Sequence, residues 1–426
     1  MIFTLGFIFL LLFIAAGLPI GFALGVAGVA SLALLVPLDS ILVLMSKVAH
    51  STSASYILLT IPMFVLMAEF LAVGGVAKDL LLSCNRLLRN IRGGMAMAVI
   101  LAGTLHAAVT GSSTASAASL SRASFPAMKA AGYRPSFAVG TIAIAGTLAC
   151  MIPPSTAFIL YGLMTDTSIG KLFVGGIFPG LLTAVGYLIT ISLMLKLRPE
   201  WGPKPGAEAE AAALPSGTGR VWPVTVLIVV VLGGLYSGVA TPTEISALGA
   251  LGALIVSIAT GRMTRKGFSD AVMGTLRITS MILLIILSAH LFGYFISFSQ
   301  VTDSLLRWIS ESGMSPTWVM LLIVLIYLLL GMVMDQAAII ILTAPLSTAL
   351  MVGLGYDPIW WGIIIVKTAE IGLVSPPLGL VTFVVSSSSR VPLNESFKGA
   401  IPFLIAEMVI LALLLAFPAI SLFFVS

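Results

Sequence analysis

Charged residues are scarce in this chain, and their scarcity excludes most soluble folds. Only 9% of the 426 residues are Asp, Glu, Lys or Arg, whereas soluble domains carry about a quarter. Hydrophobic residues make up 59%, and the mean hydropathy is +1.16. The apolar runs are continuous and lack the alternation of a membrane β-barrel, so the sequence predicts an all-α polytopic membrane protein.

Cysteine is equally scarce, and the chain has little excess charge of either sign. Cys84 and Cys150 are isolated and lack metal-ligand spacing, so neither a disulfide framework nor a zinc site is predicted. The net charge is +5, and the basic residues lie mainly in connecting segments, which indicates membrane topology and not nucleic-acid binding. The sequence has no glycine-rich loop followed by Lys-Ser or Lys-Thr, which argues against ATP as the energy source.

Two pairs of adjacent prolines interrupt apolar segments that are long enough to span a bilayer. Pro153-Pro154 lies within residues 136–165, and Pro376-Pro377 lies within residues 358–388. Proline lacks a backbone N–H and its ring clashes with the preceding turn, so we expect each helix to break there. Paired breaks at membrane depth point to a transporter binding site, although each could be an ordinary kink.

The proline segments belong to a longer internal repeat. Residues 132–135 (Gly-Tyr-Arg-Pro) match residues 355–358 (Gly-Tyr-Asp-Pro), and the same shift in numbering relates the two proline pairs without a gap. This shift is called the repeat offset below. We therefore predict a duplicated chain, with residues 1–195 as the first repeat and 221–426 as the second. The hydrophilic stretch 196–220 is expected to be a flexible cytoplasmic linker.

The distribution of basic residues predicts that the two repeats have opposite orientations. The stretch near 74–92 is expected to be an interfacial arm on the cytoplasmic side, with three arginines between 86 and 92 along one helical face. The corresponding stretch of the second repeat carries Asp303 and Glu311 instead. The excess of Lys and Arg is therefore expected on opposite ends of the helices in the two repeats. This change is expected for inverted-topology repeats, each crossing the membrane five times and leaving both termini outside.

Each repeat also contains an apolar segment with small polar residues at its centre. Residues 95–121 have basic flanks on both sides, which predicts a re-entrant hairpin, although small-residue helix packing is an alternative. The second hairpin is predicted at about 317–350, where the repeat offset places Asp335 opposite Ser112. A buried aspartate at a hairpin tip would be neutralised by a cation, so we expect a cation site there.

Lys367 and Glu370 lie in the segment that leads into the second proline break. Three residues apart on a helix, they could pair with one another. The Lys367 ammonium could instead be the counter-ion of a substrate carboxylate. The sequence leaves both interpretations open.

Several motifs carry a resemblance to a known family. They are Gly111-Ser112-Ser113, Pro126-Ala127-Met128-Lys129, Gly132-Tyr133, Ile152-Pro153-Pro154-Ser155, Thr241-Pro242-Thr243-Glu244, Gly331-Met332, Asp335, Glu370-Ile371-Gly372 and Ser375-Pro376-Pro377-Leu378-Gly379. Over nearly its whole length the chain resembles the large (DctM-type) membrane subunit of tripartite ATP-independent periplasmic (TRAP) transporters, within the ion-transporter superfamily.

The resemblance implies sodium-coupled uptake of an organic acid, such as a sialic acid, a dicarboxylate or a sugar acid, across the bacterial inner membrane. It implies Na⁺ as the coupling ion and no cofactor. The implied partners, besides the lipid bilayer, are a periplasmic substrate-binding protein and a small four-helix membrane subunit. An elevator-type motion of the hairpins and broken helices is also implied.

The resemblance further implies that solute and sodium bind at the hairpin tips and the unwound proline segments. Sodium is expected near Ser112, Ser113, Asp335 and Ser375. The expected binding residues are Ser112, Ser113, Thr114, Cys150, Pro153, Pro154, Ser155, Asp335, Gln336, Lys367, Glu370, Ser375, Pro376 and Gly379. Two residues depart from the family pattern: Val381, where many relatives have asparagine, and Lys367, at a position that is more often uncharged.

Three other functions are compatible with parts of the pattern. One is a dicarboxylate or citrate-type sodium symporter that works without a binding protein, and another is a sodium/proton antiporter that uses Asp335. The third is an intramembrane enzyme, which we do not expect. His106 and Ser112 are six residues apart and so lie on largely different helical faces, and no His-Glu-x-x-His motif is present.

Overall fold

The structure is a computed structural model that describes residues 2–203 and 221–425. Most of the predicted linker, 196–220, lies outside the described residues. The described part of the chain is helical and contains no strand, which confirms the predicted fold class. Within it, seven helical segments are long and apolar enough to cross a membrane, and six shorter apolar helices accompany them.

The helices follow one another in the same order in both halves of the chain. The first half contains α1 (Ile2–Ala15), α2 (Ile20–Leu32), α3 (Leu38–Ser53), η1 (Tyr56–Leu59), α4 (Thr60–Val73), α5 (Val76–Leu88), α6 (Gly94–Thr110), α7 (Ser113–Ala130), α8 (Pro135–Met151), α9 (Thr156–Thr165), α10 (Ile169–Leu197) and η2 (Pro199–Trp201). The second half contains α12 (Trp222–Tyr236), α13 (Pro242–Ala259), α14 (Arg265–Phe298), α15 (Val301–Ser312), α16 (Pro316–Gly331), α17 (Gln336–Gly353), α18 (Pro358–Val374), α19 (Leu380–Ser389), α20 (Leu393–Ala416) and α21 (Ala419–Leu422).

The repeat offset relates the helix boundaries as well as the motifs. It carries both ends of α7 onto the ends of α17, and both ends of α8 onto the ends of α18. The halves differ at α14, a continuous helix of 34 residues, because the aligned stretch of the first half is divided into α3 and α4. The opposite membrane orientation of the two halves remains a prediction.

One detail of the predicted arm is wrong. The three arginines between 86 and 92 do not share one helical face, because α5 ends at Leu88. The chain turns directly after it to enter α6, and Gly93 adopts the left-handed backbone conformation that this turn requires, with φ +82°.

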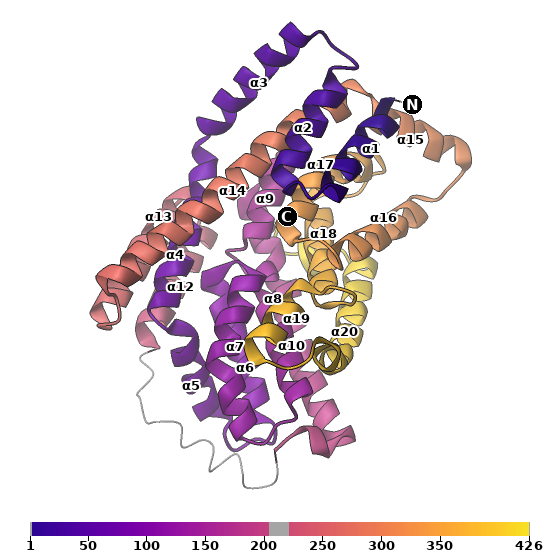
Figure 1. The fold of residues 1–426 in the computed structure, drawn as a ribbon. Helices are drawn as coiled ribbons and strands as arrows, with labels where there is room; N and C mark the ends of the chain where they lie inside the picture. Colours follow the sequence, from indigo (N-terminus) through magenta and orange to yellow (C-terminus); the bar gives the residue numbers. More distant parts are fainter. Residues whose placement is uncertain (1, 204–220, 426) are drawn as a thin grey trace.

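The outer helices of each half pack against outer helices of the other half. We call α2, α4, α13 and α14 the exchanged outer helices. Helix α4 packs along α13, and α2 packs along α14, so each half is covered by helices of the other (Figure 1). Between α4 and α13, the hydroxyl oxygens of Thr60 and Thr243 are 2.8 Å apart, and Ser257 Oγ donates to the Phe70 carbonyl at 2.8 Å. These contacts lie at both ends of α4, so the pair is in contact along its length.

Small residues set the distance between α2 and α14. A Cβ added at Gly28 would come within 2.9 Å of the Phe292 backbone nitrogen, and one added at Gly25 would come within 2.9 Å of Ser288 Oγ. Glycines that allow two backbones to approach closely are typical of helix packing in membranes. Gly25 and Gly28 therefore allow α2 to pack closely against α14.

Helix α8 lies at the centre of the molecule. It contacts α6, α7, α18, α19 and α20. In the apolar stretch within residues 135–165, 89% of the residues are buried. It crosses α20 where Gly140 meets Gly399, and an added Cβ at Gly399 would lie 1.8 Å from the Ser136 carbonyl oxygen. The two backbones touch here, which fixes α8 against the second half.

The predicted inversion can be tested by cysteine labelling of intact cells. We expect a cysteine introduced at Glu311 to react with a membrane-impermeant maleimide added from the periplasm. A cysteine at Arg89 should react only after the inner membrane is permeabilised. Labelling of both positions from the same side would contradict inverted repeats.

Candidate functional site

The first proline pair separates α8 from α9. The cis-linked Pro153 and Pro154 cannot donate to the carbonyls one turn before them, so the carbonyl of Cys150 needs another partner. Ser155 provides it: its Oγ donates to the Cys150 carbonyl oxygen at 2.5 Å and accepts from the Phe158 backbone N–H at 3.4 Å. The same serine therefore closes the break and caps α9.

The tip of the first hairpin packs on this break. The Gly111 carbonyl accepts from the Thr156 backbone N–H at 3.2 Å and from its hydroxyl at 2.7 Å. Gly111 has φ +61°, and an added Cβ would lie 2.7 Å from the Pro154 carbonyl oxygen, so the position requires glycine. Ser112 and Thr114 beside it are half-buried, and their hydroxyl oxygens are 3.4 Å apart.

The side chain of Cys150 joins the two hairpins. Its Sγ is 2.5 Å from Ser113 Oγ and donates a short hydrogen bond to Gln336 Oε1. Ser113 and Gln336 are the first residues of α7 and α17, and the repeat offset makes them equivalent, so two equivalent helix N-termini meet at one thiol. Because a helix N-terminus carries about half a positive charge, their convergence favours a nearby anion.

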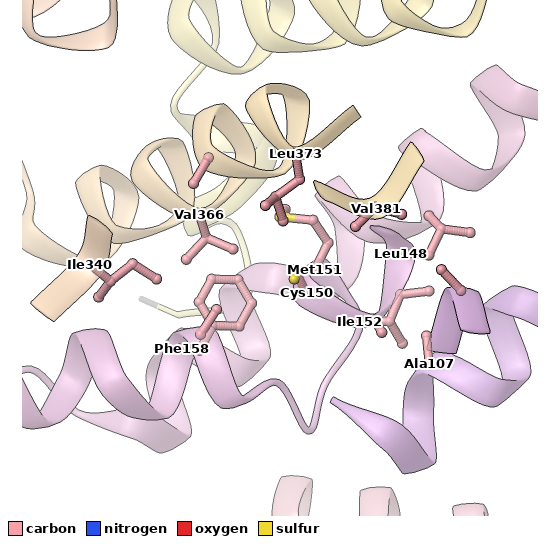
Figure 2. Close-up of a cluster of buried hydrophobic side chains, with 14 of the residues drawn as sticks. Ala107, Leu148, Cys150, Met151, Ile152, Phe158, Ile340, Val366, Leu373 and Val381 are labelled. Atoms are coloured by element: carbon pink, nitrogen blue, oxygen red, sulfur yellow. The ribbon is translucent and has the colours of Figure 1, made fainter. Parts of the chain in front are cut away.

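Apolar side chains from both halves surround this junction. Figure 2 shows Phe158 of the first half beside Ile340 and Val366 of the second, and Leu148 of the first half beside Val381 of the second. All five are fully buried, so the first break is enclosed by protein. Unpaired backbone at a break is tolerated in a membrane under this condition.

The second break is more open than the first. Pro376, also cis-linked to Pro377, is exposed, as are Pro377 and Leu378, whereas Pro153 and Pro154 are buried. Ser375 is buried, and its Oγ donates to the carbonyl of its own helical turn. The two breaks thus have unequal access to their surroundings, although their sequences are equivalent.

The prediction that Asp335 is buried at the second hairpin tip is wrong. Asp335 is exposed. It is the N-cap residue of α17, and its Oδ2 accepts from the Ala337 backbone N–H at 3.0 Å. Among the described residues, no hydrogen bond joins Asp335 to Ser375 or Pro376. Gly379 caps α19 with φ +50° at the far end of the second break.

Lys367 and Glu370 belong to a larger charged cluster than the sequence indicated. Lys367 Nζ is 3.3 Å from Glu370 Oε2, donates to Thr183 Oγ1 at 3.0 Å and forms a short ion pair with Glu407 of α20. Tyr187 of α10 donates a short hydrogen bond to Glu407. An ammonium has three N–H donors, so these three partners leave no Lys367 donor for a solute.

Sequence reasoning did not single out Glu407, although the signal was present. It is a lone carboxylate in the apolar run Phe-Leu-Ile-Ala-Glu-Met-Val-Ile, and ionisable residues at membrane depth usually face a partner. Glu407 has no exposed surface, and its cluster ties α20 to α18 and α10. The sequence therefore indicated two of the three charged groups of this cluster.

A separate cavity of about 730 Å³ lies between the exchanged outer helices and the corner that joins α9 to α10. Its polar lining includes Thr52, Asp166, Ser168, Thr243 and His290, and no residue of either proline pair lines it. Its volume suits a small organic solute.

Comparison with known proteins identifies the relatives of the chain. The family described as "Tripartite ATP-independent periplasmic transporter, DctM component" matches residues 7–420. The C4-dicarboxylate TRAP transporter large permease protein DctM of Pseudomonas aeruginosa is 38% identical over 402 residues, covering 94% of this chain and 93% of that protein. The isethionate TRAP transporter permease protein DctMQ of Oleidesulfovibrio alaskensis is 31% identical over 97% of this chain and 65% of its own length.

A solved structure has the same fold. The YdaH transporter of Alcanivorax borkumensis superposes with a TM-score of 0.65 at 14% identity, covering 90% of each chain. At this identity the likeness concerns the arrangement of helices and not the solute.

Proposed function

Because the chain belongs to the DctM family of tripartite ATP-independent periplasmic transporters, we propose that it moves a small organic acid inward together with sodium. It is a transporter subunit of the inner membrane and not an enzyme. The observation that supports the proposal best is the meeting of two equivalent helix N-termini and a broken helix at Cys150.

The proposed solute is an organic anion. An isolated carboxylate that enters hydrocarbon meets an idealised penalty on the order of 20 kcal/mol, which oriented dipoles must offset. The N-termini of α7 and α17 supply such dipoles beside the first break. The names of relatives include a C4-dicarboxylate and isethionate, and both are small acids with anionic oxygens.

The proposed coupling ion is sodium. Ser112 and Thr114 present two hydroxyl oxygens on the first hairpin tip, and Asp335 presents an accessible carboxylate on the second. Oxygen donors of this kind suit a hard cation. Each sodium that enters contributes about 2.3 kcal/mol per 100 mV of membrane potential.

The proposed partners and motion follow the family. A periplasmic binding protein would deliver the solute, and a small membrane subunit, separate or fused as the name DctMQ indicates, would complete the complex. The hairpins and broken helices would move against the exchanged outer helices α2, α4, α13 and α14. The unequal exposure of the two breaks supports this, because alternating access requires one side to be open at a time.

The function is tested by uptake of C4-dicarboxylates and isethionate into proteoliposomes that contain the complex. Asp335→Ala should raise the sodium concentration for half-maximal uptake about tenfold, because the carboxylate is lost. Asp303→Ala, on the exposed side of α15, is the matched control and should behave like wild type.

Three results would contradict the proposal or part of it. Uptake by the wild-type complex that is the same with and without a sodium gradient would exclude sodium coupling. Sodium activation of Asp335→Ala that matches the Asp303→Ala control would remove Asp335 from the ion site. Sodium/proton exchange without any organic acid would instead favour an antiporter.

A further inference from the structure

A second cavity, of about 350 Å³, lies at the opposite end of α8 from the first break. It is formed where α7 ends, α8 begins and α19 turns into α20. Three of the residues that line it are cationic, namely Lys129, Arg134 and Arg390. One carboxylate, Glu395, also lines it, but Lys398 forms an ion pair with this carboxylate at 2.7 Å. The lining therefore has an excess of positive charge.

The N-terminus of α8 opens into this cavity without a cap. Arg134 is the N-cap residue, and within residues 2–203 and 221–425 no side chain caps the first turn of the helix. The first amides of a helix have no partner within it, so those of Ser136 and Phe137 need an acceptor from elsewhere. Pro135 precedes them and has no amide of its own.

Ser136 provides a second and independent indication of a ligand. It lines the cavity, only 4% of its surface is exposed, and its hydroxyl has no hydrogen-bond partner among the residues that the structure describes. Buried hydroxyls are normally paired, because an unpaired one costs about 1–3 kcal/mol. An acceptor in the cavity would satisfy it.

The other half of the chain shows what such an acceptor looks like. The repeat offset makes Asp357 the equivalent of Arg134, and α18 begins directly after it. The Asp357 carboxylate accepts from the amides of Ile359 at 2.8 Å and Trp360 at 3.0 Å, which are the counterparts of Ser136 and Phe137. The first half has a cation where the second has this oxyanion.

Trp201 holds Arg134 at the edge of the cavity. The Trp201 carbonyl accepts from the Arg134 backbone N–H at 3.1 Å, and the guanidinium lies 5.8 Å from the centre of the indole ring. Arg198 lies over the same ring at 5.1 Å, so a further cation is close by. The arrangement presents positive charge to the cavity from several elements.

We propose that this cavity binds an external oxyanion, a phosphate or a carboxylate, which caps α8 in the place that Asp357 occupies on α18. Its source is either the phosphate of a phospholipid headgroup or a free anion in solution, since both present the same acceptor oxygens. The site lies apart from Cys150 and both proline breaks, so the proposal does not depend on the transported solute.

The test uses the purified full-length protein and its thermal unfolding in detergent. Sodium phosphate is compared with sodium chloride at equal ionic strength, and short-chain phosphatidylglycerol is compared with phosphatidylcholine. We expect phosphate or phosphatidylglycerol to raise the unfolding temperature of the wild type. Arg390→Gln should increase the half-saturating concentration about tenfold, because one charge-assisted hydrogen bond is lost.

Arg134→Asp makes the first half resemble the second and gives the sharpest test. Its own carboxylate should cap α8, so the unfolding temperature should no longer respond to phosphate or phosphatidylglycerol. Arg122→Gln is the matched control, because it removes a cation of α7 that does not line the cavity. A response to the lipid alone identifies a headgroup, and a response to phosphate alone identifies a free anion.

Two results would overturn the proposal. One is a wild-type protein whose unfolding temperature responds to neither phosphate nor phosphatidylglycerol. The other is an equal loss of response in Arg122→Gln and Arg390→Gln, which would show general attraction to basic charge and not a site. If Arg134→Asp does not fold, the comparison of Arg390→Gln with Arg122→Gln decides alone.

Discussion

Replacing Lys367 with glutamine is expected to destabilise the protein by about 3–5 kcal/mol, because it removes the cation of a buried ion-pair cluster. The change leaves Glu370 and Glu407, which both pair with Lys367, without this cation, and neither has an exposed surface. Glu407→Gln should cost less, because Lys367 and Glu370 remain paired. The unfolding midpoint of the purified protein measures both.

Combined variants distinguish the observed cluster from a simple pair of neighbours. If Lys367 and Glu370 were the whole interaction, changing both to glutamine would restore most of the stability. With Glu407 present, this double variant should recover only part of it, and adding Glu407→Gln should recover more. Lys398→Gln, which breaks an exposed pair, is the control and should shift stability by less than about 1 kcal/mol. Equal stability of Lys367→Gln and this control would refute a buried cluster.

Substitution of Gly399 is expected to separate α8 from α20. A Cβ at this position would lie 1.8 Å from the Ser136 carbonyl oxygen, and the obstacle is backbone that cannot rotate away. Overpacking in a tightly packed interior typically costs about 1–3 kcal/mol and sometimes more, so Gly399→Ala should cost at least this much. Gly399→Val should cost more still, with loss of folded protein after purification.

Gly293 supplies the matched control for this substitution. It also lies in a helix, α14, and an added Cβ there would meet no atom of the described part of the chain within 4 Å. Gly293→Ala should therefore be neutral or stabilising by up to about 1 kcal/mol, because alanine favours the helix. A Gly399→Ala variant that is as stable as Gly293→Ala would show that the two helices do not touch as described.

The sequence predicts the helical fold and the proline breaks because each depends on local chemistry, whereas the re-entrant hairpins remain a prediction. Two adjacent prolines remove two donors in succession, so the ends of α8 and α18 follow from the two pairs, whereas single prolines such as Pro126 and Pro402 lie inside helices. The repeat offset adds the boundaries of α7 and α17. Family membership is confirmed by the comparisons, whereas sodium coupling and the inverted orientation remain predictions.

What the sequence does not show depends on contacts between distant segments. Glu407 and Lys367 are on different helices, so their pairing has no spacing that could be recognised. The thiol of Cys150, expected to bind only through the resemblance, lies between Ser113 and Gln336, which are far apart in the chain. The exposure of Asp335 depends on what covers a hairpin tip, and neighbouring residues in the sequence do not specify it.

The exchanged outer helices also set an order for biogenesis. Helix α4 is made long before α13, its partner along the whole of its length. Until α13 enters the bilayer, the hydroxyl of Thr60 lacks Thr243, and the Phe70 carbonyl lacks the Ser257 hydroxyl. Lipid cannot replace these partners, so a nascent chain with only its first half inserted leaves the Thr60 hydroxyl without Thr243, although the Phe70 carbonyl keeps its hydrogen bond from the Gly74 N–H. We therefore expect α4 to reach its final packing only after α13 has entered the bilayer.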